Sequence, residues 1–339
     1  MPGQRPLVSV LLPAWNASRS LTAALDSLLG QSLADFELLA VDDGSTDETL
    51  DILHDHARRD RRVRVLRLSH GGIVRALGAG LAEARGKYLA RMDADDMCAP
   101  TRLERQVALL DSRPDLGLVS CLVEHGGDSR TCGGYSHYVD WINSLVKPED
   151  IFLHRFVESP LAHPSVMFRR ELVERFGGYR QGPFPEDYDL WLRWLAAGVR
   201  MEKVPEPLLT WNDLPERLSR THTNYAPEAF QRLKSAALAD WLLRSGHREV
   251  MVWGAGRVTR RRAGLLPEHG ISIKAWLDID PAKIGRVLDS RPVLSPEELP
   301  LPGNGFVLSY VGSRGARELI RARLEAAGYR LGRDFLPVA

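Results

Sequence analysis

The chain has no apolar run that approaches the roughly 20 residues a membrane-spanning helix needs. Its first segment, MPGQRPLVSVLLPAWN, has a short apolar stretch, and Trp-Asn follows where a secretory signal would have a small-residue cleavage site. We therefore interpret this segment as a first strand. Together these absences predict a cytoplasmic protein with at most peripheral contact with the inner surface of a membrane.

Cysteine is scarce, and an excess of charge of one sign is missing. The three cysteines, Cys98, Cys121 and Cys132, are odd in number and do not have metal-site spacing, which argues against a disulfide framework and for a reduced chain. Lys and Arg number 45 and Asp and Glu 44, so the net charge is +1. This balance gives no reason to expect a nucleic-acid partner.

Strand-like and helix-like segments alternate along the first third of the chain. The strand-like segments are residues 7–13, 36–45, 63–68 and 87–92. Each precedes a segment with apolar residues at helical spacing, which predicts an α/β fold with a mainly parallel sheet covered on both faces. Ligands of such sheets bind beyond the carboxyl ends of the strands. Asn16, Asp42, Asp43 and the acids at 93–96 should therefore converge on one crevice.

Three carboxylates, Asp93, Asp95 and Asp96, directly follow the strand-like segment 87–92. Like charges this close repel one another unless a cation is shared among them. Hard oxygen ligands suit Mg²⁺ or Mn²⁺ that also coordinates a substrate diphosphate. A solvated turn rich in Asp is the alternative, and the position at the ligand edge of the sheet favours the metal site.

Two further acidic pairs also stand at element boundaries. Asp42 and Asp43 follow a strand and could accept hydrogen bonds from a base or from ribose hydroxyls. The alternative is that they stabilise the start of the next helix, where acids are favoured by the helix dipole and where Ser45 and Glu48 have capping-box spacing.

The pair Glu186 and Asp187 begins a helix, where capping alone would also select acids. A carboxylate partly desolvated by the neighbouring Phe184, Tyr188 and Trp191 could instead act as a general base toward an acceptor hydroxyl.

These segments resemble family 2 glycosyltransferases in their order and spacing, over about residues 6–225. The matching stretches are VSVLLPAWN, DFELLAVDDGSTDET, ARGKYLARMDADD, HPSVMFRRELVERFGGY and EDYDLWLRW. The resemblance implies a GT-A fold, a nucleotide-diphosphate sugar as donor and a hexosyltransferase-type reaction that inverts the anomeric carbon. It also implies a glycan or lipid-linked acceptor, as in surface-polysaccharide assembly, with a UDP-sugar as the favoured donor.

The resemblance also assigns roles to residues. It implies that Asp95 ligates Mn²⁺ or Mg²⁺, that Asp93 lies near the ribose or the metal, and that Asp187 is the base with Glu186 beside it. The implied donor-binding residues are Pro13, Ala14, Asn16, Asp42, Asp43, Arg75 and Asp93.

Two positions depart from the family pattern. Gly78 stands where many relatives have Asn, and Leu214 stands where a His often precedes the segment LPERLSRTH. If that His touches the diphosphate, the contact is missing here or passes to His222, which we keep as a candidate metal or diphosphate ligand.

The last part of the chain repeats the strand–helix alternation. We predict a glycosyltransferase domain over 1–225, a linker helix over 226–246 and a Rossmann-like domain over 247–339. The segment GAGRVTRR holds Gly254 and Gly256 but Thr259 at the third glycine position. Asp278 or Asp280 ends the second strand about where a ribose-binding acid belongs. NAD(P) or another nucleotide could bind there; a domain used only for packing or assembly is the alternative.

Three other functions remain open on the sequence alone. The C-terminal domain could make the protein an oxidoreductase or sugar-modifying enzyme, although the last hundred residues contain no Tyr-x-x-x-Lys. The chain could be a non-catalytic sugar-nucleotide-binding module, which the presence of both Asp95 and Asp187 disfavours. A sugar nucleotidyltransferase would have a glycine-rich loop where this chain has PAWNAS.

Overall fold

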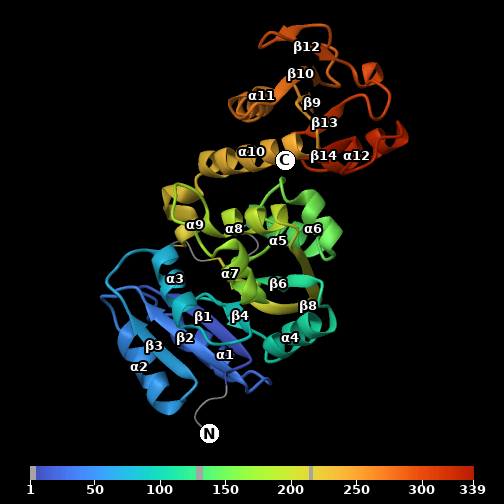
Figure 1. Ribbon diagram of the computed structural model, residues 1–339. Helices are drawn as coiled ribbons and strands as arrows, with labels where there is room; N and C mark the ends of the chain where they lie inside the picture. The colour runs from blue at the N-terminus through green and yellow to red at the C-terminus, as the bar shows by residue number, and fades with distance from the viewer. Residues whose placement is uncertain (1–4, 127–132, 214–216) are drawn as a thin grey trace. The chain divides into compact units, whose positions relative to one another are not determined.

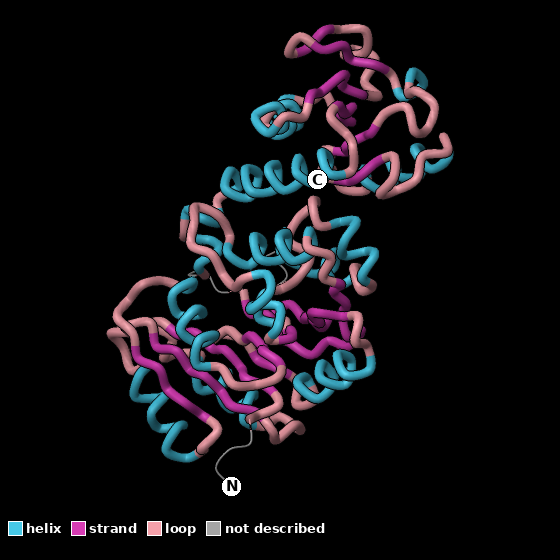
Figure 2. Tube along the Cα trace, in the orientation of Figure 1, coloured by secondary structure: helices cyan, strands magenta, loops and turns pink. Residues whose placement is uncertain are grey.

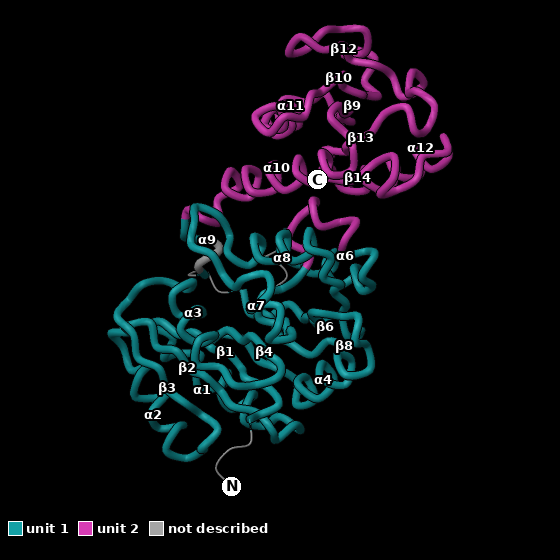
Figure 3. The backbone as a smooth tube through the Cα atoms, viewed as in Figure 1, with its two compact units in different colours: residues 1–151, 161–222 teal, residues 152–160, 223–339 magenta. Residues whose placement is uncertain are grey.

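The computed structural model describes residues 5–126, 133–213 and 217–339. They form two compact units, one of residues 1–151 and 161–222 and the other of residues 152–160 and 223–339 (Figure 3). Each unit is described by itself below.

The first unit alternates strands and helices in its first half (Figure 1). In order, this half contains β1 (Val8–Ala14), α1 (Leu21–Leu29), β2 (Phe36–Asp42), α2 (Thr49–Arg59), β3 (Val63–Arg67), α3 (Ile73–Glu83), β4 (Tyr88–Arg91), β5 (Met97–Cys98) and α4 (Arg102–Ser112). The second half contains β6 (Leu116–Gly126), α5 (Gly133–Ser144), α6 (Pro148–His154), β7 (Met167–Arg169), α7 (Glu171–Phe176), α8 (Glu186–Ala196), β8 (Arg200–Asn212) and α9 (Leu218–Thr221). The last three residues of α6, 152–154, belong to the second unit.

One sheet of order β3-β2-β1-β4-β7-β6-β8-β5 organises these elements (Figure 2). The first four strands are parallel, as the sequence predicts. Beyond β4 the sheet is mixed: β7 is antiparallel to both β4 and β6, β8 is parallel to β6, and β5 is antiparallel to β8. Every residue of β2 is buried, which is the pattern of a strand covered by helices on both faces.

Two long strands of the second half, β6 and β8, were not predicted. Both contain polar residues that are nevertheless buried, such as Ser120 in β6 and Lys203 in β8. The predicted capping box is also wrong. Glu48 is the N-cap of α2 and its side chain makes no capping hydrogen bond within the described residues. The Ser45 hydroxyl accepts the N–H of Asn16 at 3.0 Å, and Asp47 accepts the N–H of Thr49, the first residue of α2, at 3.1 Å.

The second unit has a six-stranded sheet of order β11-β12-β10-β9-β13-β14. Its elements are α10 (Pro227–Arg244), β9 (Glu249–Trp253), α11 (Arg257–Ala263), β10 (Ser272–Leu277), β11 (Val287–Leu288), β12 (Arg291–Leu294), β13 (Phe306–Ser309), α12 (Ala316–Ala326) and β14 (Phe335–Pro337). All neighbouring pairs are parallel except β11 with β12. The helix expected as a linker is α10, and it packs against the short 3-10 helix at Leu266–His269 in this unit.

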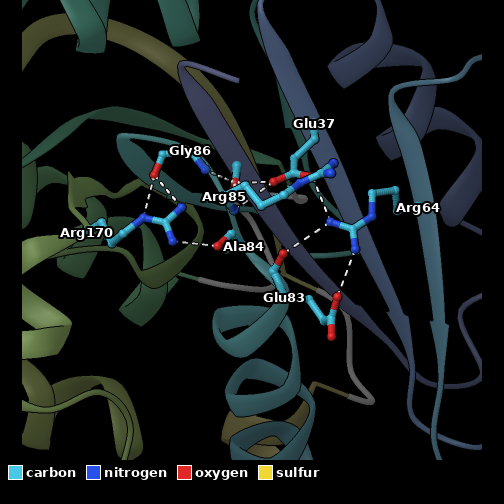
Figure 4. Close-up of polar contacts among 8 residues, drawn as sticks. Glu37, Arg64, Glu83, Ala84, Arg85, Gly86 and Arg170 are labelled. Atoms are coloured by element: carbon cyan, nitrogen blue, oxygen red, sulfur yellow. Dashed lines mark hydrogen bonds and ion pairs between the residues drawn. The ribbon is translucent and has the colours of Figure 1, made fainter. Parts of the chain in front are cut away.

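A buried carboxylate links several elements at the amino-terminal edge of the first sheet. Glu37 of β2 accepts hydrogen bonds from the Ser9 hydroxyl at 2.7 Å and from the guanidinium groups of Arg85 and Arg64 at 2.7 and 2.8 Å (Figure 4). Burial alone would raise its pKa, but the hydrogen bonds from Arg85, Ser9 and Arg64 outweigh it and lower the pKa to about 2. Nearby, Arg170 donates to the carbonyl oxygens of Ala84 and Gly86.

We predict that Glu37→Gln lowers the free energy of unfolding at pH 7 by about 2–3 kcal/mol, because two cations lose a buried charged partner. The folded-state pKa is depressed, so the contribution is complete above the unfolded value of 4.5 and is lost as the pH falls toward 2. Denaturant unfolding between pH 3 and 7 measures both effects. Glu83→Gln, which removes an exposed partner of Arg64, should cost under about 1 kcal/mol. Equal losses in the two variants would contradict the role given to Glu37.

Candidate active site

The predicted acidic residues lie at one edge of the first sheet. Strand β1 pairs in parallel with β2 on one side and β4 on the other, with Ala14 opposite Asp42 and Leu11 opposite Arg91. The carboxyl ends of all three strands therefore meet at the same edge. The Ser20 hydroxyl also donates to the carbonyl oxygen of Ala94 at 3.0 Å and ties the loop after β1 to the acidic loop after β4.

Asp93, Asp95 and Asp96 form a group whose carboxylate oxygens lie within 4.8 Å of one another. Asn212 of β8 holds this loop: its backbone N–H donates to Asp96 Oδ1 at 2.8 Å, and its side chain donates to the carbonyl oxygen of Asp95 at 2.5 Å. Asp96 Oδ2 is buried and has no hydrogen-bond partner among the described residues.

The pKa values of this group show that its negative charge is not fully compensated. Burial and the neighbouring Asp93 raise the pKa of Asp95 to about 6, and burial, Asp93 and Asp95 also raise the pKa of Asp96. Three carboxylates with one unsatisfied oxygen are a donor set that fits a hard divalent cation such as Mg²⁺ or Mn²⁺. Asp96 joins the predicted Asp93 and Asp95 as a candidate ligand.

A cationic side chain missed by the sequence analysis faces this group. Arg217 donates to the Tyr135 hydroxyl at 2.6 Å, and its guanidinium lies 4.9 Å from the centre of the Trp211 ring. Burial opposes its charge, but Tyr135, Asp93 and Asp96 raise the pKa of Arg217 above its ordinary value. Arg217 belongs to the segment in which a family His was expected, and Leu214, the position of that departure, lies outside the described residues.

The pair at the end of β2 is buried and already engaged. Asp43 accepts hydrogen bonds from the backbone N–H groups of Gly71 and Gly72 at 3.0 and 2.8 Å, so its carboxylate anchors the loop between β3 and α3. Asp42 accepts the N–H of Ser45 at 3.2 Å, while its Oδ2 is buried and finds no hydrogen-bond donor within the part of the chain that the structure describes.

The loop after β1 closes against the loop after β2. Ala14 accepts the N–H of Asp43 at 2.9 Å, and the half-buried Pro13 precedes it in β1. Asn16 has a left-handed backbone, with φ 48°, and its side chain accepts the N–H of Thr46 at 2.9 Å. Asn16 therefore shapes this loop, whatever it does toward a ligand.

An exposed aromatic pair stands at the same edge. Trp15 is 52% exposed, unusually open for tryptophan, and stacks on His70 with ring centres 4.5 Å apart. The predicted donor residue Arg75 donates to the backbone oxygen and hydroxyl of Ser69, both at 2.9 Å, and so supports the loop that carries His70. A Trp directly after a strand end was the available sequence signal for this pair.

The second acidic pair begins α8. Asp187 accepts the N–H of Tyr188 at 2.7 Å, and burial together with the adjacent Glu186 raises the pKa of Asp187 to about 7. Glu186 is 3% exposed and lies 3.7 Å from His163 Nδ1. The other ring nitrogen of His163 is 2.8 Å from the Tyr179 hydroxyl, and burial and Arg91 lower the pKa of His163 well below its ordinary value.

One buried guanidinium faces both acidic groups. Arg91, the last residue of β4, is 1% exposed and pairs with Asp93. Its charge also lowers the pKa of Asp187 from the value that burial alone would give, and Asp93 and Tyr179 in turn raise the pKa of Arg91 against the effect of its own burial. Arg91 thus links the 93–96 acids to Asp187, a residue that the sequence analysis did not place in the crevice.

Other predicted residues lie elsewhere. His222 is exposed and is not part of the acidic ligand group found among the described residues. Gly78, which replaces the Asn of many relatives, is exposed in α3. A Cβ added there would meet no described atom within 4 Å, so the structure has room for a side chain at this position. In the second unit, Asp278 accepts the N–H of Ala255, in the turn between Gly254 and Gly256, at 2.9 Å.

Comparisons with known proteins identify this architecture. Residues 9–177 match the family Glycosyl transferase family 2. The amylovoran biosynthesis glycosyltransferase AmsE of Erwinia amylovora is 30% identical over 210 residues, 60% of this chain and 75% of that protein. The O-antigen biosynthesis glycosyltransferase WbnJ of Escherichia coli is 28% identical over 242 residues, 70% of this chain and 89% of that protein. The chain belongs to glycosyl transferase family 2, and it is a glycosyltransferase.

Solved structures show the same fold. TarS 1-349 of S. aureus, in complex with UDP-GlcNAc, superposes with a TM-score of 0.56 and 20% identity over 77% of this chain and 71% of that chain. The mannosyltransferase PcManGT of Pyrobaculum calidifontis, in complex with GDP-Man and Mn²⁺, gives 0.51 and 20% over 79% of this chain and 74% of that chain. The predicted GT-A fold is confirmed. No helix in the described ranges is both long and apolar enough to cross a membrane.

We predict that Asp187→Asn raises the free energy of unfolding at pH 8 by on the order of 2 kcal/mol. The folded-state pKa of Asp187 is raised from 3.8 to about 7, so the unfolded chain loses this proton first and stability falls as the pH rises between those values. The gain should be small at pH 4 and largest at pH 8, as measured by denaturant unfolding.

Asp189→Asn, two residues along α8, is the matched control. Asp189 is fully buried and accepts hydrogen bonds from Arg193 at 2.9 Å and Arg180 at 3.1 Å, so its loss should destabilise the protein by about 2 kcal/mol or more. Destabilisation by both substitutions would show that Asp187 is a structural cap.

Proposed function

We propose that this glycosyltransferase moves a sugar from a nucleotide-diphosphate sugar to a hydroxyl acceptor, with inversion at the anomeric carbon and with a divalent cation. The observation that carries the proposal is the convergence of an acidic, metal-compatible group and a carboxylate of raised pKa around Arg91. The first suits a diphosphate leaving group and the second an acceptor hydroxyl.

The donor would lie along the carboxyl edge of β2, β1 and β4. Trp15 and His70 present aromatic surface at this edge. The unsatisfied oxygen of Asp42 is a suitable acceptor for a nucleoside N–H or hydroxyl. UDP-GlcNAc in TarS and GDP-Man in PcManGT support a nucleotide sugar, and we favour a UDP-sugar on the family resemblance.

The diphosphate would lie between the acidic group and Arg217. When bound, Mn²⁺ or Mg²⁺ held by Asp93, Asp95 and Asp96 would neutralise charge that develops on the departing diphosphate. Arg217 supplies a fixed guanidinium on the same side, oriented by Tyr135 and Trp211, and guanidinium forks match phosphate oxygens. Arg217 would therefore take over the role of the His that the family pattern leads one to expect at Leu214.

Asp187 would take the proton of the acceptor hydroxyl. Its raised pKa makes it a better base than an ordinary Asp while leaving a useful fraction ionised near neutral pH. The adjacent Glu186, which lies 3.7 Å from His163 Nδ1, contributes to this raised pKa. The acceptor would be a glycan or lipid-linked glycan of surface-polysaccharide assembly, in keeping with the O-antigen and amylovoran functions named for the relatives.

We predict that Asp95→Asn abolishes divalent-cation-dependent hydrolysis or transfer of a UDP-sugar and weakens Mn²⁺ binding, because it removes one of three charged ligands from the acidic group. Radiolabel transfer and calorimetric titration with Mn²⁺ measure the two effects. Asp35→Asn, an exposed carboxylate before β2, is the control and should leave both unchanged. An unaltered rate in Asp95→Asn would remove this residue from the site.

We predict that Asp187→Asn lowers transfer by roughly 10²–10⁴-fold while donor affinity, measured calorimetrically, stays within about twofold. Because the base must be ionised, the wild-type rate should rise with pH through the region near 7, and the residual rate of the variant should lose that rise. A comparable loss of donor affinity would instead place Asp187 in the donor site.

A further inference from the structure

The second unit contains a small cavity at the carboxyl edge of its own sheet. The cavity has a volume of about 70 Å³ and is lined by His154, Ser309, Arg317, Glu318, Ile320, Arg321, Leu331, Phe335 and Pro337. Ser309 and Pro337 are the last residues of the parallel neighbours β13 and β14. Ligands of open α/β sheets bind at this edge.

The cavity has room for a small polyatomic group. About 10–15 Å³ of such volume holds one water molecule, so 70 Å³ admits a group of about five to seven heavy atoms. A phosphoryl group has this size.

The inner wall of the cavity offers an unused hydroxyl. Ser309 is 3% exposed, and its Oγ forms no hydrogen bond with any residue in the described ranges. A buried hydroxyl without a partner costs free energy, on the order of 1–3 kcal/mol. Its position in the cavity wall lets a bound group satisfy it.

The outer wall is cationic. Arg317 and Arg321 stand one turn apart on α12, and His154 also lines the cavity, while the exposed Glu318 is the single carboxylate in the lining. Outside the lining, Glu325 pairs with Arg321 and Glu158 acts on Arg317. Arg317 is anchored by donation to the backbone oxygen of Ala339 at 3.1 Å, and burial lowers its pKa from the ordinary value. A partly desolvated guanidinium gains more from an anion than a solvated one does.

The start of α12 adds backbone donors. The N-cap is Gly315, which has no side chain to cap the helix. The N–H of Ala316 donates to the carbonyl oxygen of Ser313 at 3.0 Å, so the N–H groups of Arg317 and Glu318 are the donors that the helix start can offer. This is an eleven-residue helix whose first turn contributes Arg317 and Glu318 to the lining. Its N-terminal dipole favours negative charge.

This location differs from the glycine turn after β9. There, Asp278 Oδ2 already accepts the N–H of Ala255 at 2.9 Å and the ammonium of Lys283 at 3.1 Å, while Oδ1 accepts the N–H of Asp280 at 3.0 Å. The turn is thereby closed by the protein's own groups, whereas the cavity beside β13 contains an unsatisfied one.

We propose that the cavity between β13, β14 and α12 binds a phosphoryl group, as free phosphate or as the phosphomonoester of a small metabolite. Arg317 and Arg321 supply the charge, Ser309 the inner hydrogen bond and the start of α12 the backbone donors. The second unit is then a ligand-binding module in its own right.

Differential scanning fluorimetry and calorimetry of the full chain test this, with inorganic phosphate and AMP as probes. EDTA is present, so that metal at the acidic group of the first unit contributes nothing. Potassium chloride of matched ionic strength serves as the salt control. Saturable binding of phosphate with a rise in melting temperature is expected. Preference for phosphate indicates the free ion, and preference for AMP indicates a phosphomonoester.

Three substitutions locate the binding. Arg321→Gln and Ser309→Ala should each weaken phosphate or AMP binding by about tenfold. Ser309→Ala should not lower the melting temperature of the free protein, because it removes an unsatisfied hydroxyl. Arg323→Gln is the matched control: this exposed Arg lies on the same helix and pairs with Glu297, as Arg321 pairs with Glu325, but it is not in the lining.

Absence of saturable binding to both probes would overturn the proposal. So would equal weakening by Arg321→Gln and Arg323→Gln, which indicates a diffuse charge effect. Asp95→Asn should leave phosphate binding in EDTA unchanged, so failure of the cavity and failure of the transferase site are distinguishable.

Discussion

The structure of the catalytic unit depends on one buried cation. Arg91 is fully enclosed at the end of β4, where it pairs with Asp93 and lies close enough to influence the charge of Asp187. Removing a guanidinium from water is expensive unless acids surround it, and concentrating acids is expensive unless a cation lies among them. The buried guanidinium and the buried acids therefore each reduce the free-energy cost of burying the other.

The remaining acids are not fully compensated, and the proposed chemistry would use this imbalance. Asp95, Asp96 and Asp187 all have raised pKa values because burial and like charge outweigh the help from Arg91 and Arg217. At the opposite edge of the same strands the balance is reversed. Glu37 receives Ser9, Arg64 and Arg85 and has a pKa of about 2. The buried carboxylate at the amino-terminal edge of the sheet is thus compensated by cations, whereas the carboxylates at the carboxyl edge, where ligands of such sheets bind, are not fully compensated.

Much of the fold was predictable because its signals are local. Apolar segments such as FELLAV, ending in Asp42 and Asp43, give both the strand and its functional end, and the parallel arrangement of β1 to β4 follows from the alternation with helices. Strands β6 and β8 were missed because buried polar residues such as Ser120 and Lys203 interrupt their apolar pattern, and because their pairing spans distant parts of the chain. Ser45 was assigned to a helix cap because the sequence does not show that Asn16 lies close enough to compete for its hydroxyl.

The sequence by itself determined the family resemblance, the parallel strands of the first half and the acids at their carboxyl ends, since each is carried by short runs of neighbouring residues. Only the tertiary structure decided which cations face those acids. Arg91 stands two residues before Asp93, but the sequence does not show that its guanidinium is buried or that it influences Asp187. Arg217 is one of the many arginines of a chain with 45 basic residues, and its nearness to the acidic group comes from the folded packing.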